Sequence, residues 1–183
     1  VIPDLISVLD SYCFYGCTGI TKLELGKGVA NIADHAFHGC TSLTGIEPCL
    51  PDTVTTLGGG AFQQCPMPPD CVMNGIVTIG SSAIRETQVK SIYIGPTLKT
   101  LNAGYTNGAI SYNSELTNIT FAAGITNAVI YQEHSLCGNT KLGGTIDFSG
   151  FKAVGPSALT SSGRPLDGSL VTSVIFSATL TDI

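Results

Sequence analysis

Residues 29–43 read Val29-Ala-Asn-Ile32-Ala-Asp-His-Ala36-Phe37-His-Gly39-Cys40-Thr-Ser-Leu43. Residues 6–20 follow the same pattern almost position by position, as Ile6-Ser-Val-Leu9-Asp-Ser-Tyr-Cys13-Phe14-Tyr-Gly16-Cys17-Thr-Gly-Ile20. Two further copies are Val54-Thr-Thr-Leu57-Gly-Gly-Gly-Ala61-Phe62-Gln-Gln-Cys65 and Ile76-Val-Thr-Ile79-Gly-Ser-Ser-Ala83-Ile84. Because several positions agree at once in these copies, we infer that the chain is built from repeats of one short unit.

The starts of these repeats are regularly spaced. Weaker copies begin at Leu98, Ile125 and Phe151, so the repeats start at residues 6, 29, 54, 76, 98, 125 and 151. Successive starts lie 22–27 residues apart, and periods of about 20–29 residues are typical of leucine-rich-repeat solenoids. We therefore predict a leucine-rich-repeat solenoid of about seven coils of 22–27 residues.

A second apolar cluster lies between the cysteine position of one repeat and the start of the next. It takes the form of apolar-x-apolar triplets, which are Leu23-Glu-Leu25, Ile92-Tyr-Ile94, Ile119-Thr-Phe121, Ile146-Asp-Phe148 and Val174-Ile-Phe176. This alternation is typical of a β-strand. The Ala-Phe-x-Gly-Cys segment fits a short helical or irregular turn, and no segment has the length of a long amphipathic helix. The fold is expected to be mainly β, with stacked coils that share one core.

The repeats predict a single array over residues 1–183. The coils are regular over about residues 6–101 and degenerate, with Asn-, Ser- and Thr-rich insertions, over about residues 102–183. The first residues already lie inside the pattern, and Leu180-Thr-Asp-Ile183 resembles the opening of one more copy. We expect the chain to be a segment of a longer protein.

The composition narrows the possible functions. Only 11% of residues are charged and 43% are hydrophobic, whereas about 25% charged residues are typical of soluble domains. The net charge of −5 argues against a nucleic acid partner. No uncharged apolar stretch approaches the roughly 20 residues that a membrane span requires. We predict a soluble, apolar and mildly acidic chain.

The segment Ala36-Phe37-His38-Gly39-Cys40-Thr41-Ser42-Leu43-Thr44, preceded by Val29-x-x-Ile32, closely resembles the BspA-like leucine-rich repeat, also called the Treponema-type repeat. Residues 12–18 and 60–65 carry the same signature. The resemblance is tight over about residues 6–65 and recognisable to residue 101. It implies a non-enzymatic, surface-exposed or secreted module. Such repeats occur in adhesins of oral and gut bacteria and in surface proteins of parasitic protists, and they bind host matrix proteins or other cells.

The sequence predicts no catalytic, cofactor-binding or metal-binding residue. His35, His38 and Cys40 have a spacing that metal ligands could use, but the equivalent positions of the other repeats accept many residue types, as solvent-facing positions do. The pair Asp34-His35 lacks a serine in a nucleophile-elbow context. The carboxylates are scattered, and the glycines at 58–60 are not followed by the Lys-Ser/Thr of a phosphate-binding loop.

Seven cysteines raise the question of disulfides. Cys17, Cys40 and Cys65 share one position of the repeat, and we expect Cys137 to share it too. Stacked at one position, they predict a ladder of small buried side chains, for which cysteine is well suited. If a disulfide forms, we expect it between Cys65 and Cys71, which close a short Pro-rich loop. The odd total leaves at least one thiol free unless a pair forms between chains, so the redox compartment stays open.

Two kinds of surface residue are candidates for modification or contact. Asn118-Ile119-Thr120 is an N-glycosylation sequon, which matters in a eukaryotic secreted chain. Tyr93, Tyr105, Tyr112 and Tyr131 lie in or beside the insertions. Exposed tyrosine among Ser and Asn is the chemistry of adaptable protein contacts. The alternative is that these tyrosines pack between coils.

Two functional hypotheses of different class follow. The first is a non-enzymatic cell-surface or secreted repeat module that mediates adhesin-like protein–protein interaction, with a protein or a glycan as partner. The second is a structural subunit of an extracellular filament, surface layer or virion-like assembly, in which the chain packs against copies of itself. The low charge favours the second, and the family resemblance favours the first.

Overall fold

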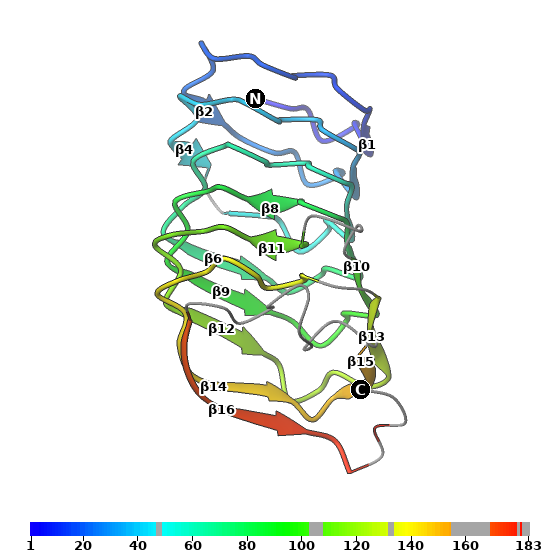
Figure 1. Cartoon of the computed structure of the whole chain (residues 1–183). Helices are drawn as coiled ribbons and strands as arrows, with labels where there is room; N and C mark the ends of the chain where they lie inside the picture. Colours follow the sequence, from blue (N-terminus) through cyan, green and yellow to red (C-terminus); the bar gives the residue numbers. More distant parts are fainter. Residues whose placement is uncertain (47–48, 103–107, 132–133, 155–168, 179, 181–183) are drawn as a thin grey trace.

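The chain winds into a stack of short coils, with its N-terminal residues at one end and its last strands at the other (Figure 1). The computed structural model describes residues 1–46, 49–102, 108–131, 134–154, 169–178 and 180. Every regular element within those residues is a β-strand, and none is a helix. The predicted solenoid of mainly β structure is confirmed.

One face of the stack is a seven-stranded parallel sheet, to which each predicted repeat contributes one strand. Its strands, in order across the sheet, are β1 (Val8–Leu9), β3 (Asn31–Ile32), β5 (Thr56–Leu57), β7 (Thr78–Ile79), β10 (Thr100–Asn102), β13 (Ala128–Tyr131) and β15 (Phe151–Val154). The register aligns the fourth residue of each of the first five repeats, from Leu9 to Leu101. In the sixth coil Ile130, not Ala128, takes this position, because it pairs with Leu101. The pairing of β13 with β15 has a register shift between Ala128 and Val129.

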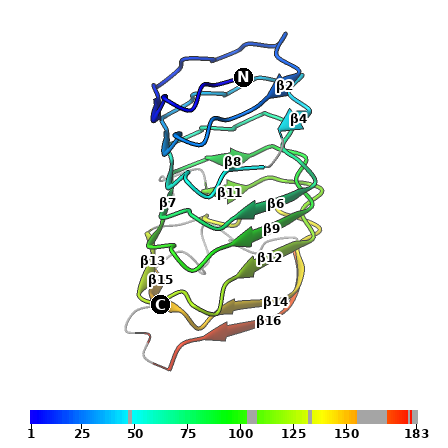
Figure 2. The ribbon, with the colours of Figure 1, turned by 180° about the vertical axis from the view of Figure 1, so that it is seen from behind.

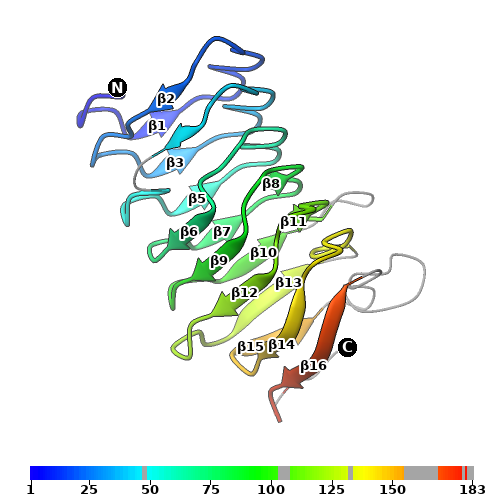
Figure 3. The same cartoon turned by 90° about the vertical axis from the view of Figure 1, so that its left-hand side faces the viewer.

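A second face carries the strands that contain the apolar triplets (Figure 3). They are β2 (Lys22–Leu23), β4 (Gly45–Ile46), β6 (Asp70–Met73), β9 (Ser91–Ile94), β12 (Asn118–Phe121), β14 (Gly143–Phe148) and β16 (Leu170–Phe176). All five predicted triplets overlap strands. The sequence did not point to β4 or β6; in β6 Cys71 and Met73 take the inward positions that Ile92 and Ile94 hold in β9.

This second face is divided into three separate sheets. The strands pair as β2–β4, β6–β9–β12 and β14–β16 (Figure 2). No strand pairing joins β4 to β6 among the described residues, although these strands belong to successive coils.

The third side of each coil is a tight turn, and strands β8 (Ile84–Arg85) and β11 (Ile110–Ser111) pair there. The turn contains no helical segment in the described coils because it places residues in the left-handed region twice. One left-handed position is filled by Tyr12, His35, Gly60, Ser82 and His134. The other is filled by Gly16, Gly39, Gln64, Glu86, Tyr112 and Gly138. These positions interrupt a right-handed helix, so the turns are irregular.

The core is made of columns of like residues that stack from coil to coil. Phe37 is fully buried and packs face to face between Phe14 and Phe62, with ring centres 5.2 and 5.3 Å away. Hydrogen bonds between adjacent turns extend this column to Ile84 and Ile110, both fully buried. Each coil therefore buries its apolar side chains only against its neighbours, as expected for a solenoid.

Two turn glycines give a matched test of this packing. Gly39 and Gly60 both have positive φ, and a Cβ at Gly39 would approach nothing closer than 3.7 Å. A Cβ at Gly60 would collide with the His35 ring of the preceding coil. We expect Gly39→Ala to cost about 1 kcal/mol for backbone strain alone, and Gly60→Ala to cost at least about twice that because the collision adds to the strain.

The measurement is urea unfolding of both variants. In a His35→Ala background, where the ring is absent, the cost of Gly60→Ala is expected to fall to that of Gly39→Ala. Equal costs for the two glycine variants in the unmodified chain would contradict the collision.

Candidate functional site

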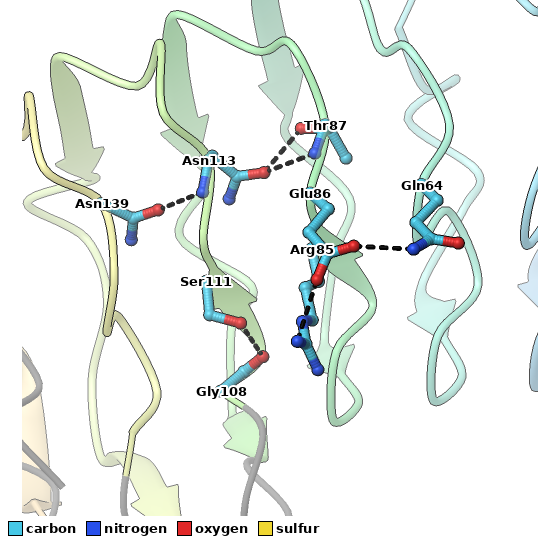
Figure 4. A network of polar contacts seen from close by, with 8 residues as sticks. All are labelled: Gln64, Arg85, Glu86, Thr87, Gly108, Ser111, Asn113 and Asn139. Atoms are coloured by element: carbon cyan, nitrogen blue, oxygen red, sulfur yellow. Dashed lines mark hydrogen bonds and ion pairs between the residues drawn. The ribbon is translucent and has the colours of Figure 1, made fainter. Parts of the chain in front are cut away.

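The cysteine position of the repeat becomes a buried polar ladder in the later coils (Figure 4). Cys40 and Cys65 are fully buried, and the next three coils place Thr87, Asn113 and Asn139 at the same position. Asn113 accepts hydrogen bonds from the Thr87 backbone N–H (2.9 Å) and hydroxyl (2.8 Å). Asn139 accepts one from the Asn113 backbone N–H (2.9 Å). This column is structural, because its members are enclosed in the core.

The expectation that Cys137 joins this column is wrong. The turn hydrogen bond from Ile110 N–H to the Ser135 carbonyl shows that Ser135 aligns with the alanine of earlier repeats. Four residues further on, the column position belongs to Asn139. Cys137 instead lies beside Tyr112, where the neighbouring thiol raises the pKa of the Tyr112 phenol.

The disulfide joins Cys49 to Cys71, with their Cα atoms 5.3 Å apart, so the expected partner Cys65 is wrong. Cys71 lies on β6 with its side chain inward, and Cys49 lies in the stretch that follows β4, one coil earlier. Cys65 is a free thiol buried in the turn column, so it is not beside Cys71. The disulfide thus links two successive coils whose strands β4 and β6 are not paired on this face.

Chemical labelling distinguishes these two pairings. Burial raises the pKa of the Cys65 thiol to about 12, and burial also raises the pKa of Cys40 and Cys137. Burial raises the pKa of Cys13 as well, so access of the reagent to the thiol decides the order. We expect alkylation of the native protein at pH 8 to modify the exposed Cys13 first and to spare the buried thiols. Peptide mapping without reductant is expected to recover a Cys49–Cys71 crosslink, and a Cys65–Cys71 crosslink would overturn the pairing.

Removing the disulfide should destabilise the array. The bond closes a separation of 22 residues, for which the chain-entropy model gives about 3 kcal/mol. We therefore expect the double variant Cys49→Ala/Cys71→Ala to lose about 3 kcal/mol of unfolding free energy in urea titrations. Cys13→Ser, which changes an exposed thiol, serves as the control and should lose less than about 0.5 kcal/mol.

A groove lies at the break between β4 and β6. The segment before β6 contains Pro66, Pro68 and Pro69, which have no N–H to donate to the preceding coil. Three depressions follow this segment, of about 450, 360 and 710 Å³. The first two share Pro66 and Gln88 in their walls, and the last two share Pro69. We call these three adjoining depressions together the proline groove.

A cluster of four rings lies on the turns of the first two coils, and the sequence analysis did not find it. Tyr12 stacks on His35 at 5.1 Å and Tyr15 packs on His38 at 4.9 Å between ring centres. The two imidazole Nδ1 atoms are 3.1 Å apart. Burial, followed by the proximity of His35, lowers the pKa of His38. The sequence does contain a signal for this cluster. Tyr and His stand at equal positions of adjacent repeats, and equal positions stack.

The predicted contact tyrosines do not form one surface. Tyr93 points outward from β9 and is 36% exposed. Tyr112 is 46% exposed on the turn side, where the Arg85 guanidinium carbon lies 4.8 Å from its ring centre. Tyr131 ends β13, and its side chain lies outside the described structure, as does the whole of Tyr105.

Asn118 points outward from β12 and is exposed. Its side-chain amide lies 3.1 Å from the Thr120 hydroxyl, within the same sequon. The side chain is therefore open to modification, and its glycosylation stays a prediction.

The described part of the chain contains no cluster of three or more His, Cys, Asp or Glu side chains placed to hold a metal ion. His35 and His38 contact one another without a third such residue. Within the same residues, no helix is long and apolar enough to cross a membrane.

The stacked parallel strands, the repeated tight turns and the exposed faces define a leucine-rich-repeat solenoid. The chain belongs to the BspA type leucine-rich repeat region family, whose family model matches six copies over residues 1–108. This family points to a protein-interaction repeat module, because a solenoid presents an extended surface along its coils.

A crystal structure of a leucine-rich repeat protein from Bacteroides ovatus is similar at 14% identity, with a TM-score of 0.37, over 100% of this chain and 73% of that one. No curated protein matches the chain.

Proposed function

We propose that this chain is a non-enzymatic repeat module of a secreted or cell-surface protein and that it mediates adhesin-like contact with a partner protein. The observation that carries the location is the Cys49–Cys71 disulfide. Structural disulfides form and persist in oxidising surroundings such as the cell exterior and are rare in reducing cytosol. Family membership supports the interaction role.

The exposed surface supports contact with another protein. Tyr12, Tyr15 and Tyr112 project from the turns, and Tyr93 and Val72 project from the second face. Exposed tyrosines supply large contact area at a low cost in side-chain entropy, so they are common in protein interfaces. Only 11% of the residues of the chain are charged, which lowers the desolvation cost of an interface.

Two measurements test the proposal. Protease treatment of intact cells of the native source should remove the module from the cell surface, or the module should be found in the medium. The purified chain should then bind one or more immobilised extracellular matrix proteins saturably. Retention of the module inside protease-treated cells would contradict the location, and lack of saturable binding across the panel would contradict the adhesin-like role.

The alternative function, a structural subunit of an assembly, predicts a different particle. Light scattering and negative-stain microscopy of the native particle should show a monodisperse short rod for an interaction module. Fibres or sheets with a regular repeat would instead make the chain a building block that packs against copies of itself.

We also propose that Asn118 carries an N-linked glycan if the chain is secreted by a eukaryotic source, because its side chain is exposed and belongs to a complete sequon. Intact-mass measurement before and after amidase deglycosylation tests this. Loss of the added mass in Asn118→Gln is expected, and an unmodified mass from a eukaryotic secretory host would contradict it.

A further inference from the structure

The proline groove lies at one of the two breaks in the second face, the one between β4 and β6. Residues equivalent to Pro69 in the following coils belong to segments that pair with their neighbours, as in the bonds from the Ser91 N–H to the Pro69 carbonyl and from Thr117 N–H to the Lys90 carbonyl. On its other side Pro69 has no N–H to offer the preceding coil. The groove is thus a gap between two sheets of this face, built into the sequence of one coil.

The wide part of the groove is apolar. Leu50, Pro51, Pro68, Pro69 and Val72 line the depression of about 710 Å³. Val72 is 47% exposed, and its register partner Tyr93 on β9 is 36% exposed. An apolar side chain of a ligand would bury area against these residues, which is what drives binding in shallow protein sites.

Two carboxylates lie beside this apolar surface. Asp52 accepts a hydrogen bond from the Asn74 amide (3.1 Å) and Asp70 one from the Ser91 hydroxyl (2.5 Å). Both line the wide depression, and among the described residues neither forms an ion pair. A hydrogen bond from a neutral donor leaves the charge of each carboxylate in place, so both remain available to a cation.

The remaining charges of the groove are already matched or outnumbered. Glu86 pairs with Arg85 and Glu115 with Lys141. Lys90 lines the middle depression. The wide depression has one lysine, Lys27, against the two carboxylates Asp52 and Asp70. The wide depression is therefore net acidic and complementary to a basic ligand.

The disulfide holds the walls of the groove. Cys49 lines the wide depression, and Cys71 lies inward on the strand that carries Asp70 and Val72. Fixing these two segments together keeps the groove formed before a ligand arrives, which reduces the entropy lost on binding.

We propose that the proline groove binds an extended peptide segment of a partner protein, in which an arginine or lysine stands next to an aliphatic or aromatic residue. The apolar residue packs on Val72, Leu50 and the prolines, while the cation pairs with Asp52 and Asp70. This inference rests on the proposed function and names the surface and the partner chemistry.

Selection of random octapeptides displayed on phage against the immobilised chain tests the proposal. We expect enrichment of peptides with a basic residue beside an apolar one. A synthetic peptide of the enriched sequence should bind at least about fivefold more weakly to Asp52→Asn or Asp70→Asn and to Val72→Ser, since fivefold corresponds to about 1 kcal/mol. Rising salt should also weaken it.

Matched controls lie on the same face of the array. Asp147 on β14 and Ile175 on β16 point outward and are register partners. Asp147→Asn and Ile175→Ser should leave binding of the peptide unchanged. Thermal unfolding of every variant shows that it is folded, and Asn at positions 52 and 70 can still accept the hydrogen bonds that Asn74 and Ser91 donate.

Three results would overturn the inference. They are the absence of enriched peptides, enrichment without basic residues, and binding that is insensitive to Asp52 and Asp70 but lost in Tyr12→Ala or Tyr15→Ala on the turns. These outcomes are separable from failure of the proposed function. If the chain binds matrix proteins equally well with and without Asp70→Asn, the groove assignment fails and the interaction module stands. If peptides bind the groove but the module is intracellular, the groove assignment stands and the proposed location fails.

Discussion

Phe37→Ala is expected to lower the free energy of unfolding by about 3–5 kcal/mol. Phe37 is fully buried, and its ring stacks between those of Phe14 and Phe62 at interplanar angles of 5° and 10°. The substitution leaves a cavity between three coils and removes two aromatic contacts, each of which adds about 0.5–1.5 kcal/mol beyond area burial. Urea unfolding followed by circular dichroism measures the loss.

The repeat itself provides graded controls for Phe37. Phe14 occupies the same column but is half-buried, so Phe14→Ala should cost clearly less. Tyr93→Ala removes a ring that points outward from β9 and should cost less than about 1 kcal/mol. Equal losses for Phe14→Ala and Phe37→Ala would contradict the column packing.

The loss at Phe37 should also be local. In a solenoid each coil contacts only its neighbours, so stability is close to a sum over coils and their interfaces. Hydrogen exchange of the Phe37→Ala variant should therefore lose protection first around β1 and β3, while β12 and β14 keep theirs. Uniform loss of protection along the whole array would show that the coils unfold as one unit.

Sequence comparison within the chain predicted most of the fold because equal positions of the repeats must stack. The Leu9-to-Leu101 column and the five strand triplets follow from spacing alone. Prediction from spacing failed where the repeat is degenerate. Ser135-Leu136 stands where earlier coils have Ala-Phe, and without that alignment Cys137 was mistaken for the column residue that is Asn139.

The candidate site was harder to predict because it depends on departures from the repeat. Pro66, Pro68 and Pro69 are visible in the sequence, but the gap that they leave between β4 and β6 appears only when the coils are stacked. The disulfide partner of Cys71 also becomes visible only when the coils are stacked. Residues one period apart lie side by side, so Cys49, 22 residues away, is closer in space than Cys65, which is near in sequence.

Asn113→Ala is the second substitution with a large expected effect, a loss of about 3–4 kcal/mol. Asn113 is fully buried, accepts from the N–H and the hydroxyl of Thr87 and donates its amide to the Ile84 carbonyl (3.0 Å). Alanine leaves the Thr87 N–H and the Ile84 carbonyl without the Asn113 side chain, and the Thr87 hydroxyl keeps only the longer bond from the Val89 N–H (3.4 Å). Each buried group that loses its partner costs about 1–3 kcal/mol before relaxation.

Cysteine at position 113 separates the two functions of the asparagine. In the second coil the Cys40 thiol donates to the Phe14 carbonyl (3.1 Å), and Phe14 holds the position that Ile84 holds later. A cysteine can thus make the bond to the preceding coil but accepts weakly from Thr87. We expect Asn113→Cys to lose about half as much free energy as Asn113→Ala, while the exposed Asn118→Ala loses less than about 0.5 kcal/mol.

If Asn113→Ala were as mild as Asn118→Ala in urea unfolding, the ladder would contribute nothing to stability. A Cys variant as unstable as the Ala variant would show that the acceptor bonds to Thr87 carry the effect, and that the thiol of the early coils is an apolar filler, not a hydrogen-bond donor.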